Sequence, residues 1–304
     1  MKSQEEIRAA LTGPVASVRT PFTRDGAIDF AGLRRVIDVA IDGGSKTVLL
    51  TNGDSLYSIL TDEEVAEVTR VTAEHVGERA LVVAADRVWA TPAEVAFARF
   101  ARGVGAHVLM VLCPDWAGSC TMDTLVEHFA AVAAEIPVML VTNWLEPRSQ
   151  AFGVGFIEQL RDQVPGVVAI KDDLCGAFAR KMGLAAHGSM AIISGGQKQN
   201  HLNAMPYGCD GYLSTYVTFC PRIAHAYWDA VSANDLVAAA GVIRDYDIPL
   251  FDSIGALPGG FDAGMHGIQE LFGIAQRWRR KPYYSLNDAE MEQLAGFFRD
   301  KGLL

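Results

Sequence analysis

Short apolar runs alternate with longer segments of helical periodicity eight times along the chain, and this repeat limits the choice of fold more than any other property. The runs are rich in Val, Ile and Leu and lack the alternation of a half-exposed antiparallel strand, which predicts parallel strands covered by helices. The expected strands are residues 15–19, 47–51, 80–85, 108–113, 138–142, 167–171, 190–194 and 211–214.

The helical segments between these runs are expected at residues 30–42, 61–76, 91–104, 122–135, 154–163, 176–187 and 198–207. Thr61 and Glu64 have the spacing of a capping box. A serial repeat of this kind predicts a closed (β/α)₈ TIM barrel, and an open dinucleotide-binding sheet is disfavoured because no G-x-G-x-x-G follows the first run. We expect the barrel over residues 1–220 and a C-terminal helical extension, packed on it within one structural domain, over residues 221–304.

Composition narrows the class of partner and the compartment. The net charge is -10, which disfavours nucleic acid as a partner. A membrane span and a secretion signal are not expected, since the chain has no apolar run of about 18 residues and its first ten residues are largely polar. Five cysteines without a C-x-x-C pair fit reduced thiols and predict a cytoplasmic protein.

Lys171 is the strongest candidate for a catalytic residue. Active sites in such barrels lie at the carboxyl ends of the strands, and Lys171 ends one of the apolar runs. Desolvation there would favour the neutral, nucleophilic amine. The alternative is a structural ion pair with Asp172 or Asp173, of which Asp172 is disfavoured because adjacent residues of a strand point to opposite sides.

The sequence also bears on two other kinds of site. The seven histidines do not converge at strand ends, so no metal site is expected. Ser194-Gly-Gly-Gln197 follows the seventh run and has the composition of a phosphate-binding loop, which keeps open a phosphosugar-type barrel enzyme.

Several segments resemble the dihydrodipicolinate synthase / N-acetylneuraminate lyase family over nearly the whole chain. They are Thr20-Pro-Phe22 with Asp25-Gly26, Val168-Ala-Ile-Lys171-Asp, and Ser194-Gly-Gly with Gly208-Cys-Asp-Gly211 and Ser214. The resemblance implies a Schiff base between Lys171 and a small-molecule 2-oxo acid, chemistry that requires no metal or organic cofactor. It also implies a homo-oligomer, a tetramer or dimer.

The resemblance also implies a set of substrate-binding residues. The family carries Gly-Thr-Thr-Gly-Glu-Ser after the second strand, where this chain has Leu50-Thr51-Asn52-Gly53-Asp54-Ser55. Thr51, Asn52 and Gly53 are therefore expected to grip the substrate carboxylate. The further expected substrate-binding residues are Asp115, Trp116, Arg148, Gly195 and Leu213.

The chain departs from the family at two tyrosines. Thr142 or Val141 stands where the family has the tyrosine that relays protons, and Pro114-Asp115-Trp116 replaces Pro-Tyr-Tyr. Thr142 is assigned as a catalytic residue that acts through water, with Asp115 or Asp54 as other proton carriers. Trp116 and Trp144 could form apolar walls for a substrate or a subunit contact.

The expected function is a class I lyase, an aldolase or a dehydratase, that acts on a pyruvate-like 2-oxo acid. Loss of both tyrosines disfavours a true dihydrodipicolinate synthase. The alternatives are a non-catalytic descendant that binds a 2-oxo acid, and the phosphosugar-type barrel enzyme.

Overall fold

The computed structural model describes residues 2–145 and 148–304, and within them eight parallel strands close into a barrel in the order of the sequence. Each strand pairs with the next, and β8 returns to β1. The barrel expected from the sequence is thus confirmed, with strand ends that differ by one or two residues. The strands are β1 Gly13–Ser17, β2 Thr47–Leu49, β3 Leu81–Ala85, β4 Val108–Val111, β5 Val138–Val141, β6 Val167–Asp172, β7 Ala191–Ser194 and β8 Gly211–Leu213.

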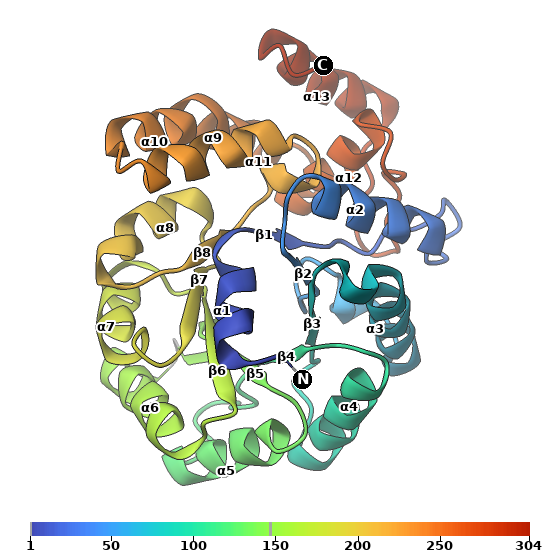
Figure 1. Ribbon diagram of the computed structural model, residues 1–304. Helices are drawn as coiled ribbons and strands as arrows, with labels where there is room; N and C mark the ends of the chain where they lie inside the picture. Colours follow the sequence, from blue (N-terminus) through green and yellow to red (C-terminus); the bar gives the residue numbers. More distant parts are fainter. Residues whose placement is uncertain (1, 146–147) are drawn as a thin grey trace.

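Helices surround the strands as an outer layer (Figure 1). The expected capping box is present at the start of α3, where the Glu64 N–H donates to Thr61 Oγ1 and the Thr61 N–H donates to the Glu64 carboxylate. The helices of this layer are α2 Phe30–Asp42, α3 Asp62–Val76, α4 Thr91–Gly103, α5 Met122–Ala133, α6 Gln150–Gln163, α7 Gly176–Ala186 and α8 Gln197–Ala204. Short 3₁₀ turns lie at Tyr57–Ile59, Gly77–Arg79, Asn143–Leu145, Met205–Tyr207 and Tyr216–Thr218.

One helix, α1 Gln4–Leu11, precedes the first strand and is not expected from the sequence. It begins with a capping box between Ser3 and Glu6 and buries Ile7 and Leu11. The helix lies across the end of the barrel where the strands begin, in contact with β1, β6 and β7 (Figure 1). The helix α1 thus covers the end of the barrel where the strands begin.

After β8 the chain forms a helical extension beside α8 and α2 (Figure 1). It consists of α9 Pro221–Ser232, α10 Leu236–Val242, a π-helical turn Ile243–Asp247, α11 Ile248–Gly255, α12 Gly260–Leu271 and α13 Asp288–Asp300. Lys198 of α8 forms a fully buried ion pair of 2.7 Å with Asp247 of the π-helical turn. This pair joins the barrel to the extension. In the part of the chain that the structure describes, we find no helix with the length and apolarity needed to span a bilayer.

Candidate active site

A cavity of about 460 Å³ opens at the carboxyl ends of the strands. Its walls come from the ends of β4, β5, β6 and β8, from the turns after β2, β5, β6 and β7, and from α12. The residues that line it are Thr51, Asn52, Gly53, Asp54, Met110, Leu112, Val141, Asn143, Trp144, Lys171, Asp173, Gly195, Gln197, Leu213 and Phe261. Six of the expected site residues are among them: Thr51, Asn52, Gly53, Lys171, Gly195 and Leu213.

Lys171 extends into this cavity from β6, with a side chain that is 9% exposed. Its Nζ lies 2.5 and 2.6 Å from the two carboxylate oxygens of Asp173. Asp172 points to the other side of the strand, where it accepts hydrogen bonds from Thr142 and Asn200. The expected orientation of Asp172 is confirmed, and the lysine has an ion-pair partner that is itself part of the cavity wall.

Gly195 makes room for the Asp173 carboxylate. A Cβ atom at Gly195 would lie 1.7 Å from Asp173 Oδ1, so the carboxylate would have to move. A Cβ atom at Gly196 would lie 2.7 Å from Cys175 Sγ. The loop that begins at Ser194 is therefore filled by the protein's own side chains, one of them anionic, which disfavours a phosphate at this position.

The turn after β2 offers free hydrogen-bond donors to the cavity. The Thr51 hydroxyl accepts the Asp54 N–H at 2.8 Å, which leaves its own proton available for donation. Among the described residues, no backbone carbonyl accepts a hydrogen bond from the N–H groups of Asn52 and Gly53. A Cβ atom at Gly53 would meet only open space. Two free amides and a hydroxyl suit a carboxylate.

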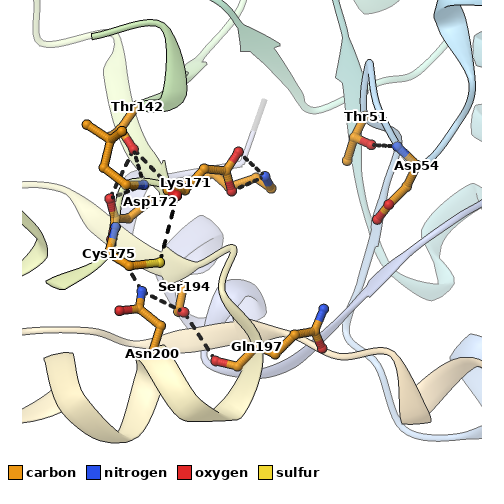
Figure 2. A network of polar contacts seen from close by, with 11 residues as sticks. Thr51, Asp54, Thr142, Lys171, Asp172, Cys175, Ser194, Gln197 and Asn200 are labelled. Atoms are coloured by element: carbon orange, nitrogen blue, oxygen red, sulfur yellow. Dashed lines mark hydrogen bonds and ion pairs between the residues drawn. The ribbon is translucent and has the colours of Figure 1, made fainter. Parts of the chain in front are cut away.

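Asp54 closes the same turn and is held by Arg19. Arg19 Nη2 lies 3.2 Å from Asp54 Oδ1. Burial alone would raise the pKa of Asp54, but the Arg19 charge, the nearby Ser17 hydroxyl and the Lys171 charge together lower it. The Asp54 carboxylate is therefore ionised and paired with Arg19. Figure 2 shows Thr51 and Asp54 on the opposite side of the cavity from Lys171.

Thr142 does not occupy the position expected of a proton relay. Its side chain is fully buried, donates to Asp172 Oδ1 at 3.0 Å and accepts the Asp173 N–H at 2.9 Å (Figure 2). Val141 lines the cavity instead, because it pairs with Lys171 in the β5–β6 register, which shifts at an irregularity between Val138 and Met139. The relay through Thr142 is thus disfavoured by its position outside the cavity wall.

Asp115, Trp116 and Arg148 also lie outside the cavity lining. Arg148 Nη1 lies 2.5 Å from the buried carboxylate of Asp115, and its guanidinium stacks over the Phe152 ring at 4.0 Å. Trp116 is 81% exposed, so it forms no wall of the cavity within this chain, whereas Trp144 does. Arg148 is committed to Asp115 and does not reach the cavity to meet a second substrate carboxylate.

The catalytic and substrate-binding residues expected from the sequence do not include several lining residues: Met110, Leu112, Asn143, Asp173, Gln197 and Phe261. The sequence analysis places Asp173 at the strand end as a possible ion-pair partner of Lys171, and the structure confirms that pair. Its place in the cavity wall follows because residues two apart at the end of a strand point to the same side, and Lys171 points inward. Phe261 had no such signal, since it belongs to α12, far along the chain. No group of three or more metal-ligating side chains is found in residues 2–145 and 148–304.

Comparison with known proteins gives a consistent result. Residues 10–300 match the model of the dihydrodipicolinate synthetase family. A 4-hydroxy-tetrahydrodipicolinate synthase of Acidiphilium cryptum is 28% identical over 293 residues, which cover 96% of this chain and 99% of that protein. The 4-hydroxy-tetrahydrodipicolinate synthase 2 of Streptomyces coelicolor is 30% identical over 278 residues, 90% of each chain.

Two solved structures share the fold. YagE, an E. coli K12 prophage protein solved in complex with pyruvate, superposes with a TM-score of 0.81 at 23% identity, covering 96% of this chain and 99% of that one. A dihydrodipicolinate synthase of Bacillus clausii superposes with a TM-score of 0.83 at 22% identity, covering 98% and 100%.

Proposed function

This chain belongs to the dihydrodipicolinate synthetase family, and from that premise we propose that it is a class I lyase in which Lys171 forms a Schiff base with a pyruvate-like 2-oxo acid. The observation that carries the proposal is the placement of the Lys171 amine in a cavity whose opposite wall, Thr51 to Gly53, offers free donors for a carboxylate. The curated relatives are named as synthases and YagE was solved with pyruvate, which supports the same substrate class.

The chemistry follows from an amine and a 2-oxo acid in one cavity. The neutral Lys171 amine attacks the keto carbon, water leaves, and an iminium ion forms. The iminium accepts electrons from a breaking C–C or C–O bond, so the activity is that of an aldolase or a dehydratase.

Synthase activity of the dihydrodipicolinate type is not part of the proposal. Among the described residues that line the cavity, none is a tyrosine, and Lys171 is the one cationic side chain. Arg148, which would meet a second carboxylate, is paired with Asp115. We infer that the reaction partner or leaving fragment carries no carboxylate of its own.

Further expectations from the sequence accompany this proposal. We propose a cytoplasmic homo-oligomer, a tetramer or dimer, that acts on a small-molecule 2-oxo acid without a metal or organic cofactor. The exposed Trp116 supports a contact between subunits. Sedimentation of the wild type and of Trp116→Ala tests this contact, which is rejected if the wild type is a monomer.

The test of the catalytic proposal is borohydride trapping with pyruvate and a panel of other 2-oxo acids. Intact mass and peptide mapping should place the reduced adduct on Lys171. Lys171→Ala should abolish the adduct, whereas Lys181→Ala, on the exposed side of α7, should not. If the folded wild type forms no adduct with any acid, the chain is the non-catalytic binding protein or acts on another substrate class, and the proposal is wrong.

A further inference from the structure

Lys171 and Asp173 form a pair inside the cavity that is better placed for proton transfer than any other acidic group nearby. Both carboxylate oxygens of Asp173 lie within 2.6 Å of Lys171 Nζ, and both residues line the cavity. The Asp173 side chain is 24% exposed, so an incoming substrate can reach it.

The protein holds the Asp173 carboxylate in this position from two sides. The Thr142 hydroxyl accepts the Asp173 N–H at 2.9 Å, which fixes the backbone just beyond β6. Gly195 leaves the space that Asp173 Oδ1 occupies, since a Cβ atom there would collide with it at 1.7 Å.

The other side chains that the sequence suggests as proton carriers are less suitable for this role. Asp54 is engaged by Arg19, on the opposite wall. Asp115 is buried outside the cavity against Arg148. Thr142 points away from the cavity and has both hydrogen-bonding roles of its hydroxyl filled.

We propose that Asp173 is the catalytic acid and base of Schiff-base formation at Lys171, in the role that the family assigns to a tyrosine. This inference rests on the proposed function. Asp173 accepts a proton from the Lys171 ammonium, and the resulting amine forms a C–N bond to the keto carbon as the carbonyl π electrons move to oxygen. The protonated Asp173 gives its proton to that oxygen and becomes a carboxylate again.

The same carboxylate serves the dehydration. Asp173 removes a proton from the nitrogen of the carbinolamine and passes it to the hydroxyl, which leaves as water while the nitrogen lone pair forms the C=N bond. The products are one water, a protonated imine and an Asp173 carboxylate beside it. The sum is an ammonium and a ketone that give an iminium ion and water, so protons and charge balance.

The rate of borohydride trapping with pyruvate tests the assignment. Asp173→Asn keeps the shape of the side chain but cannot carry a proton, and it should slow trapping on Lys171 by about 100-fold, within the range for a lost general acid–base group. Asp173→Ala should be slowed likewise and should regain rate as formate is added, because formate can occupy the vacated space and transfer protons. A side chain with only a structural role would not be replaced by formate.

Gly195→Ala provides a second route to the same defect. The added methyl group should displace the carboxylate and slow trapping in an otherwise folded protein, and Asp173→Asn combined with Gly195→Ala should be little slower than either alone, since both remove one interaction. Gly188→Ala is the matched control, because a Cβ atom there meets no neighbour.

The outcomes separate this inference from the proposed function. If the wild type is trapped on Lys171 and Asp173→Asn is trapped at the same rate, the Schiff base stands and Asp173 is not its proton carrier. If Asp173→Asn is trapped slowly but formate does not accelerate the trapping of Asp173→Ala, the carboxylate has only a structural role and the assignment is wrong. If no 2-oxo acid is trapped by the wild type, both proposals fail.

Discussion

At the scale of single residues, the site depends on which side of a strand end each side chain faces. Lys171 and Asp173 face the cavity, whereas Thr142 and Asp172 bond to each other behind it. Thr142 and Asp172 thus hold the backbone behind the cavity, and we propose that Lys171 and Asp173 meet the substrate. A shift of one residue in the register of β5 would exchange Val141 for Thr142 in the wall.

Arg148 provides a test at this scale, because the sequence and the structure assign it different roles. Arg148→Ala leaves the Asp115 carboxylate, whose side chain is 3% exposed, without its charged partner. We expect the free energy of unfolding to fall by about 2–4 kcal/mol, the cost typical of a broken buried pair. Trapping of pyruvate on Lys171 should stay within about threefold of the wild-type rate, because Arg148 does not line the cavity.

Urea denaturation and borohydride trapping measure the two quantities. Arg148→Met with Asp115→Asn removes both charges and should recover part of the lost stability. A large loss of trapping with unchanged stability would contradict this account and return Arg148 to the substrate site.

At the scale of elements, the sequence predicts the barrel well because each strand is buried on both faces and reads as an apolar run. It fails for α1, since this short helix buries only Ile7 and Leu11 and its other positions are mostly polar. Lys171 and the turn from Thr51 to Gly53 could be predicted from strand ends and family resemblance. Phe261 could not, because only the folded extension brings α12 to the cavity.

A buried ion pair is one of the contacts between α8 and the extension, beside the hydrogen bonds of Tyr227 to α8. Lys198 and Asp247 have no exposed side-chain surface, and the Lys198 ammonium also lies 4.8 Å from the centre of the Tyr216 ring. Burial lowers the pKa of Lys198 and raises that of Asp247, and each charge opposes the shift of the other. The two charges are therefore stable in this interior only together.

Asp247→Asn should accordingly destabilise the protein by about 3–5 kcal/mol, because it leaves the Lys198 ammonium buried without a counter-charge. The double variant Lys198→Met with Asp247→Leu should recover most of this loss, as apolar side chains of similar size need no partner. Thermal and urea denaturation measure both. If Asp247→Asn is as stable as the wild type, the pair does not hold α8 to the extension.

At the scale of the whole molecule, the two segments outside the eightfold repeat, the helix α1 and the C-terminal extension, reach opposite ends of the barrel. The helix α1 covers the end of the barrel where the strands begin, while α12 of the extension supplies Phe261 to the cavity at the other end. Phe261 also lies under the Arg19 guanidinium, 5.3 Å from ring centre to Cζ, and Arg19 holds Asp54. The extension thus completes one wall of the site and supports the turn that faces Lys171.

The barrel layer also contains a pair of buried carboxyl groups that bears on the stability of the whole protein. Asp86 follows β3, Glu94 lies in α4, and both are almost completely buried. In the described part of the chain, Asp86 Oδ1 and both Glu94 carboxylate oxygens have no hydrogen-bond donor. Burial raises the pKa of Asp86 to about 7 and, with the nearby Asp86 charge, that of Glu94 to about 9. The native protein therefore retains a proton here that the unfolded chain has lost by neutral pH.

This retained proton makes the free energy of unfolding depend on pH. Because the pKa values are raised in the native state, the stabilising contribution is complete below the ordinary carboxyl range of about 4 and is lost as the pH rises through about 9. For each proton that only the native state retains, the free energy of unfolding should fall by up to about 1.4 kcal/mol for every unit by which the pH rises within that window. Glu94→Gln has nothing to ionise and should show a shallower slope, measured by urea denaturation from pH 6 to pH 9. Glu292→Gln, at an exposed position of α13, should keep the wild-type slope. Equal slopes in all three proteins would mean that Glu94 holds no such proton.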